Sequence, residues 1–144
     1  FRGTTFDWGE GYWQDVMHYP GSKHVGLGAE FLRRYPWQRF VPRAESLPEG
    51  RPYAHAAGIP CVVAIYYFPV AYTDRALAGM SGHPISIRPD EHFEASWFNP
   101  RSGALTHIGH VEPDAAGKWL PPLPSREDWV LLLEAPSGKG QESP

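Results

Sequence analysis

The sequence predicts a mainly β protein, a small antiparallel β-sandwich with one N-terminal amphipathic helix. Short apolar segments rich in β-branched and aromatic residues recur at spacings of about 8 to 15 residues, which predicts strands. Turn-forming residues separate these segments: 15 glycines and 16 prolines among 144 residues, well above the usual combined share of about 12%. The helix is predicted because one stretch near the N-terminus carries apolar residues at helical spacing.

The helix is expected over residues 23–35. Ser22 can cap it directly after a Pro-Gly pair, and Pro36 ends it because the residue before a proline is pushed out of the helical region. The apolar positions at helical spacing are Val25, Gly28, Phe31, Leu32 and Tyr35. A glycine inside a helix costs about 1 kcal/mol relative to alanine. Gly26 and Gly28 therefore predict close packing of this helix against another element.

A lead-in rich in glycine and aromatic residues precedes the helix, with a short helical turn expected at residues 13–18. The strands are expected at residues 52–56, 59–68, 84–88, on both sides of a turn at 99–103, and at 129–134. Residues 59–68 are apolar on both faces, as in a central strand, and are expected to bury Cys61. A turn at Ala57-Gly58 precedes this strand, and a loop over residues 69–83 with a weakly helical piece follows it.

The turn at residues 99–103 is the clearest local signal in the chain. Asn99 suits its first position because the side chain can bond to the backbone two residues on, and Pro100 pre-sets φ at the second position. Gly103 supplies the left-handed conformation that returns the chain to a strand. Alternation predicts that the incoming strand has one buried face, formed by Phe93, Ala95 and Trp97.

Composition and charge argue against several classes of function. The net charge is −3 and, apart from the Arg33-Arg34 pair, the basic residues are scattered, so no nucleic-acid partner is expected. No apolar stretch approaches the roughly 18 residues of a membrane span, so no membrane partner is expected either. The single Cys61 cannot form an intramolecular disulfide, which leaves the cell compartment open.

The histidine pattern predicts no metal site, and no motif predicts a cofactor. His107 and His110 are three residues apart on an expected strand, where side chains alternate between faces. They cannot face one metal ion without a bulge. His18 and His24 flank the start of the helix without a third ligand nearby in the sequence.

No catalytic residues are expected in this chain. Glycoside hydrolysis needs two carboxylates about 5 to 10 Å apart, and Asp7, Glu10 and Asp15 lie in an aromatic setting that could suit a sugar. An enzyme complete in this chain would need one of them to meet another acid in a pocket. The chain has no Gly-x-Ser-x-Gly elbow, and Gly26-Leu27-Gly28 lacks the further glycine of a dinucleotide-binding loop.

The aromatic side chains divide into core and surface candidates. Trp97 and Trp129 are expected in the core by strand alternation. The candidate ligand surface comprises Tyr72, Trp119 and Arg101. The candidate inter-domain patch comprises Phe6, Trp8, Trp13 and Trp37. A chain terminus rarely carries so many large apolar groups, so we expect this chain to be a fragment whose front packs against a part that this sequence lacks.

Six segments, in their order and spacing, resemble the C-terminal end of a family of bacterial glycoside-hydrolase-like proteins. They are Pro20-Gly21-Ser22, Arg33-Arg34-Tyr35-Pro36-Trp37, Val41-Pro42, Ala64-Ile65-Tyr66-Tyr67-Phe68-Pro69, Trp97-Phe98-Asn99-Pro100-Arg101-Ser102-Gly103 and Asp128-Trp129-Val130-Leu131-Leu132. In that family an apiosidase-like (β/α)₈ barrel is followed by a β-sandwich labelled a collagen-binding domain of a collagenase. Asn99 stands where the family has Asp, which preserves the turn role, and residues 70–84 depart from the family's short turn.

The resemblance implies a domain organisation and a role. Residues 1–40 would be a lead-in and the barrel's last helix, residues 41–136 the β-sandwich, and residues 137–144 a mobile tail. The chain would be a non-catalytic accessory domain whose partner is the preceding barrel, which would hold the catalytic carboxylates. A secreted or periplasmic location of the parent protein follows only from the resemblance. The alternative is an independent module that binds collagen or polysaccharide and displays its large aromatic side chains.

Overall fold

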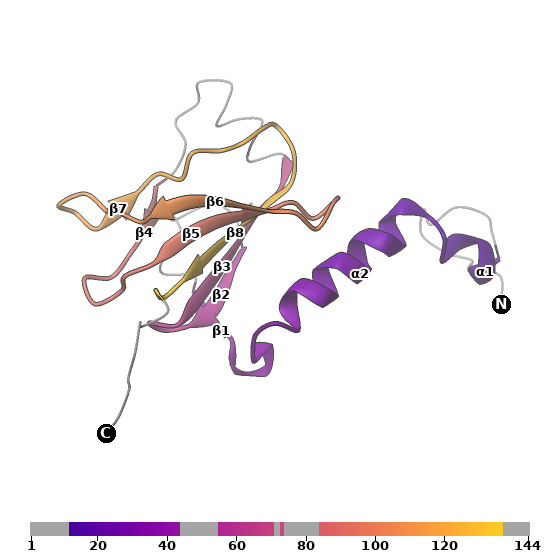
Figure 1. The fold of residues 1–144 in the computed structure, drawn as a ribbon, viewed down its shortest axis with the longest axis horizontal. Helices are drawn as coiled ribbons and strands as arrows, with labels where there is room; N and C mark the ends of the chain where they lie inside the picture. The colour runs from indigo at the N-terminus through magenta and orange to yellow at the C-terminus, as the bar shows by residue number, and fades with distance from the viewer. Residues whose placement is uncertain (1–11, 44–54, 71–72, 74–83, 137–144) are drawn as a thin grey trace.

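The computed structural model describes residues 12–43, 55–70, 73 and 84–136, and it confirms the mainly β prediction. Six strands form an antiparallel sheet in the order β1-β2-β3-β8-β5-β6, and two more form a separate β4-β7 sheet (Figure 1). The strands are β1 (Val41–Pro42), β2 (His55–Ile59), β3 (Val63–Phe68), β4 (Ile85–Ser86), β5 (Glu94–Phe98), β6 (Leu105–His110), β7 (Lys118–Trp119) and β8 (Trp129–Glu134).

Three helical segments precede the sheet: α1 (Trp13–Val16), α2 (Pro20–Leu32) and the short 3₁₀ helix η1 (Trp37–Arg39). The prediction of Ser22 as the helix cap was wrong. Tyr19 is the N-cap residue, with extended backbone angles, and Pro20 lies at the start of α2. Proline suits this position because its missing N–H is one that a helix leaves unpaired anyway.

The connection between β2 and β3 corrects two predictions. β2 continues through Gly58 to Ile59, and the turn follows at residues 60–62, where Val62 donates its backbone N–H to the carbonyl of Ile59. Pro60 pre-sets φ for the second turn position, and Cys61 takes the third with a positive φ of 57°. Cys61 is therefore exposed at the tip of a hairpin and not buried in a strand.

The turn between β5 and β6 has the predicted chemistry. The Asn99 side chain accepts a hydrogen bond from the N–H of Arg101 at 2.9 Å, and Gly103 has a φ of 77°. Gly103 also lies against α2, because a Cβ atom at this position would come within 2.9 Å of the Leu27 side chain. The turn thus joins two strands and supports the helix.

The last strand occupies the centre of the large sheet. β8 pairs with β3 on one side and with β5 on the other, as its apolar sequence on both faces allows. Leu131 and Leu133 enter one hydrophobic core, and Leu132 enters another on the opposite face. β8, which lies near the end of the chain, therefore joins β3 and β5 into one sheet.

The two faces of the large sheet are covered by different elements. The first core contains Phe68, Phe93 and Trp97, together with Ile85 from the small sheet. Both Trp97 and Trp129 belong to it, as predicted. The second core lies under the C-terminal half of α2, where the Phe31 ring stacks on Phe98 with centroids 4.2 Å apart.

A buried ion pair ties the residue after β1 to the segment before β5. Both guanidinium NH₂ groups of Arg43 donate to the Glu91 carboxylate, at 2.6 and 2.7 Å. Burial alone would raise the pKa of Glu91, but the hydrogen bonds and charge of Arg43 outweigh it and hold that pKa below its usual range. Arg88 adds a further contact to the same carboxylate at 3.3 Å. Sequence reasoning missed this pair because the partners lie in irregular segments far apart in the chain.

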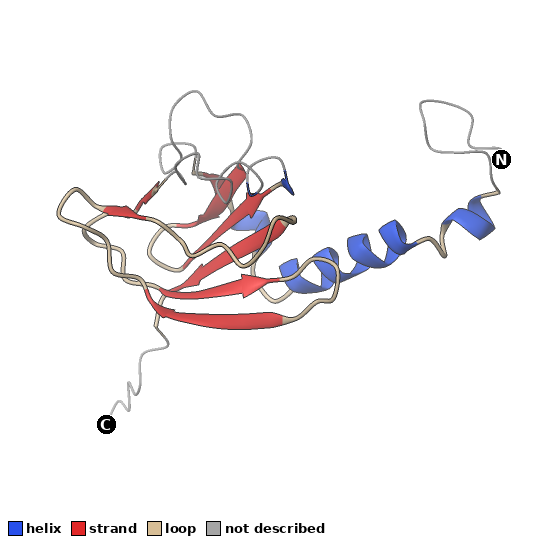
Figure 2. Cartoon of the chain, turned by 90° about the horizontal axis from the view of Figure 1, so that it is seen from above, coloured by secondary structure: helices blue, strands red, loops and turns tan. Residues whose placement is uncertain are grey.

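Only the C-terminal half of α2 packs on the sheet. Tyr35, which follows α2, donates a hydrogen bond at 2.9 Å to Glu134 at the end of β8. The pKa of Tyr35 is raised mainly by its burial and further by this hydrogen bond. In both views the N-terminal half of α2 and the whole of α1 extend past the edge of the sheet (Figures 1 and 2). The helix therefore presents much of its surface to solvent.

Candidate functional site

The projecting helix α2 has an exposed apolar face. Gly21, Val25, Gly28 and Leu32 recur every three or four residues and so lie on one side of the helix, which we call the apolar flank. Val25 is 74% exposed, although it is a large apolar residue. Apart from the adjacent residues and the helix's own backbone, no atom of the described residues lies within 4 Å of a Cβ placed on Gly21, Gly26 or Gly28. The close packing predicted for the glycines of this helix is thus not made within the described part of the chain.

Further large apolar side chains are exposed near this flank in the sequence. They are Tyr12, Met17, Tyr19, Trp37 and Val41. Trp37, a member of the predicted inter-domain patch, is 51% exposed at the start of η1. Single exposed apolar residues are ordinary on a protein surface, but a concentration of them marks an interaction site.

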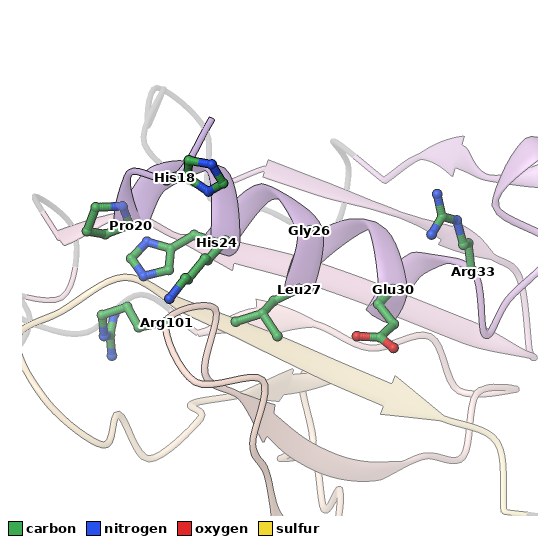
Figure 3. A pocket seen from close by; sticks show the side chains of 9 residues that line it. His18, Pro20, His24, Gly26, Leu27, Glu30, Arg33 and Arg101 are labelled. Atoms are coloured by element: carbon green, nitrogen blue, oxygen red, sulfur yellow. The ribbon is translucent and has the colours of Figure 1, made fainter. Parts of the chain in front are cut away.

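A second exposed surface of α2 is concave and basic. The depression has a volume of about 630 Å³ and lies between the helix and the β5–β6 turn. We call it the basic groove; its lining residues are His18, Pro20, Lys23, His24, Gly26, Leu27, Glu30, Arg33 and Arg101. Leu27 and Glu30 project from the same side of the helix, and Arg101 lies below its N-terminal end (Figure 3). Sequence reasoning missed the groove, because Arg101 reaches it only through the tertiary fold.

Arg101 is held in place by contacts around the start of β8. Its guanidinium group donates to the Asp128 carbonyl at 2.7 Å and to the Glu127 carboxylate at 3.0 Å. The same group lies over the Trp129 ring, 5.2 Å from its centroid. Arg101 therefore fixes the turn to β8, and the ligand-binding role expected from the sequence stays a prediction.

Trp119, the second member of the predicted ligand surface, is partly buried. Its backbone pairs with Ile85 in the small sheet, and its side chain packs against the first core. Leu120, the next residue in the sequence, is exposed. The structure thus leaves less of Trp119 open to a ligand than the sequence predicts.

His107 and His110 come together because β6 contains a bulge. The register passes from His107 opposite Ser96 to Gly109 opposite Ala95, and Gly109 has a φ of 127°. Both imidazoles then approach Glu94, at 3.6 and 3.3 Å. No group of three or more His, Cys, Asp and Glu side chains within the described residues is arranged to hold a metal ion.

Several predicted residues lie outside the part that the structure describes. Phe6, Trp8 and Tyr72 belong to this group, as do Asp7 and Glu10. Asp15 is exposed on α1. The described backbone includes Trp13 in α1, but its side chain lies outside the description. None of the helices described is long and apolar enough to cross a membrane.

Comparisons with known proteins find one family model that matches part of the chain and solved structures of similar fold. Residues 79–134 match the family model described as "Putative collagen-binding domain of a collagenase". No curated protein matches significantly. A solved structure titled "Glycoside hydrolase" is similar to this chain, with a TM-score of 0.62 and 19% identity over 91% of the chain.

A second similar structure is a glycoside hydrolase family 5 protein from Bacteroides vulgatus ATCC 8482. It has a TM-score of 0.61 and 19% identity over 85% of this chain. At this identity the likeness concerns the fold. The chain spans only 29% of the length of the first solved protein and 26% of the second.

Proposed function

We propose that this chain is a non-catalytic accessory β domain from the C-terminal end of a larger glycoside-hydrolase-like protein. The matched family model describes a binding domain and not a catalytic one. The two similar glycoside hydrolases are each more than three times as long as the part that this chain matches. A catalytic domain elsewhere in the parent protein accounts for both findings.

The apolar flank of α2 is the observation that carries the proposal. Its two glycines allow the backbone of another element to approach closely, and Val25 and Leu32 offer apolar area to bury. The flank lies on the helix that leads from the N-terminal side of the chain into the sheet. A domain that precedes this chain would therefore meet the flank first.

The occupant we propose for this flank is the preceding barrel of the parent protein. Trp37, half-exposed just after α2, would extend the contact toward the sheet. In this arrangement the helix belongs structurally to both domains: its Phe31 side packs on the sheet and its Val25 side packs on the barrel. The accessory domain would then hold the last helix of the barrel in place.

The upstream coding sequence tests the proposal most simply. A reading frame that continues upstream through about 250 residues of alternating strand and helix pattern is expected, because that is the usual length of a (β/α)₈ barrel. A start codon directly before Phe1 would contradict the proposal, since no barrel would then precede the flank.

The second candidate function is an independent module that binds collagen or polysaccharide. The matched family model names collagen, and Trp119 is the partly exposed aromatic residue that could contact such a ligand. Retention of the chain on insoluble collagen or polysaccharide, lost in Trp119→Ala but kept in Trp37→Ala, would favour this function. Near-ultraviolet circular dichroism must show that both variants keep the packed core. Retention on none of the materials would exclude a module of this kind.

A further inference from the structure

The basic groove lies on a different side of α2 from the apolar flank. At about 100° per residue, Val25 stands about 160° from Lys23, about 140° from Glu30 and about 80° from Arg33 around the helix axis. A domain packed on the apolar flank therefore leaves the side of the helix that carries Lys23 and Glu30 open, and Arg33 lies at its margin. The groove needs an explanation of its own, and that explanation does not depend on a preceding domain.

The groove carries positive charge on a protein whose net charge is negative. Lys23, Arg33 and Arg101 line it together with one carboxylate, Glu30, and Arg101 is also paired with Glu127, whereas the whole chain carries a net charge of −3. Within the described part of the chain, no carboxylate lies within ion-pair distance of Lys23 or Arg33. His18 and His24 add further donors at the N-terminal end of the groove. This lining favours an anionic ligand.

The dimensions of the groove favour a chain-like ligand over a single small ion. Lys23 and Arg33 are ten residues apart on the helix side, which corresponds to about 15 Å along its axis. The volume of about 630 Å³ lies in the range of ordinary ligand pockets. Arg101, at the N-terminal end of the groove, is held by hydrogen bonds to Asp128 and Glu127. A ligand bound at that end would therefore contact a side chain that is already ordered.

The remaining lining residues distinguish between classes of anion. The Glu30 carboxylate can accept hydrogen bonds from sugar hydroxyl groups, whereas the phosphodiester groups of a nucleic acid have no donor to offer it. Pro20 and Leu27 supply apolar surface for the C–H faces of sugar rings. We propose that the basic groove binds an acidic oligosaccharide, a sugar chain that carries carboxylate groups.

The proposal is tested by calorimetric titration of the whole chain at low salt. The probes are an alginate hexamer, in which every sugar carries a carboxylate, and neutral maltohexaose of the same length. We expect the alginate hexamer to bind, to lose affinity as salt is raised, and to bind at least about tenfold more weakly to Lys23→Gln/Arg33→Gln, because charge-assisted hydrogen bonds are lost. Maltohexaose should not bind measurably.

Arg39→Gln is the matched control, because Arg39 is an exposed cation close to α2 in sequence and lies outside the groove lining. Its affinity for the alginate hexamer should stay within about twofold of wild type. Lys23 and Arg33 are exposed, and unchanged thermal midpoints will show that their replacement leaves the fold intact. The proposal is overturned if the alginate hexamer fails to bind, if the double variant binds it as wild type does, or if a 12-base-pair DNA duplex binds more tightly.

Discussion

At the scale of single residues, the buried ion pair between Arg43 and Glu91 is expected to have a large effect on the stability of the β domain. Glu91 and Arg43 are both almost fully buried, and two hydrogen bonds join their side chains. Removing one partner of a buried ion pair typically costs about 3–5 kcal/mol, because the other charge stays buried without compensation. Glu91→Gln should therefore lower the free energy of unfolding by about this amount at pH 7, as measured by denaturant titration.

The same variant has a predicted pH dependence. A carboxyl group whose pKa is lower in the folded protein stabilises the fold above its unfolded pKa, and this contribution is lost as the pH falls through the folded value. The stability difference between wild type and Glu91→Gln should thus be full at pH 7 and shrink below about pH 4.3. The exposed control Glu112→Gln should change stability little at pH 7. A difference that grows in acid would contradict the assignment.

Gly103 is constrained both by its backbone and by its neighbour. Alanine at its φ of 77° costs about 1–2 kcal/mol, and the new Cβ atom would press on the Leu27 side chain. Gly103→Ala should therefore destabilise the protein by at least about 1 kcal/mol. The matched change Gly26→Ala should stabilise it by up to about 1 kcal/mol, since that position is open and helical. Equal effects of the two substitutions on the thermal midpoint would show that Gly103 is not constrained.

Among the elements, α2 has one packed side and one open side. Phe31 is 3% exposed and stacks on Phe98, whereas its neighbour Leu32 is 37% exposed on the apolar flank. Phe31→Ala should cost about 3–5 kcal/mol in unfolding free energy. Leu32→Ala should cost about 1 kcal/mol or less in this chain. Similar costs for both would mean that α2 does not sit on the sheet as described.

Local patterns predicted those elements whose chemistry is local. The turn at residues 99–103, the alternating face of β5 and the last strand all follow from residues adjacent in sequence. The β2–β3 turn was missed because Pro60 and Cys61 stand inside an apolar run that is typical of a continuous strand. A proline within such a run is the signal that could have found the turn.

At the scale of the whole molecule, the sequence predicted the fold class and the overall charge, but it did not predict which distant residues are in contact. The mainly β class and the amphipathic helix could be predicted because they follow from the periodicity of apolar residues. The overall charge could be predicted because it follows from residue counts. The partners of Arg43 and Arg101 could not be predicted, because they come from segments distant in the chain. The candidate inter-domain patch rested on aromatic residues near the N-terminus, and of these only Trp37 has a described side chain.

The central claim is that another domain of the parent protein covers the apolar flank. Hydroxyl-radical footprinting measures it directly, by comparing oxidation rates of Val25, Leu32 and Trp37 in this chain alone and in the product of the complete reading frame. The internal references are Val62 in the β2–β3 turn and Leu120 directly after β7, which are 53% and 55% exposed. We predict that the oxidation rates of the three test residues are several-fold lower in the product of the complete reading frame than in this chain alone. The oxidation rates of the references should be the same in both proteins. Equal rates at Val25, Leu32 and Trp37 in both proteins would contradict the claim.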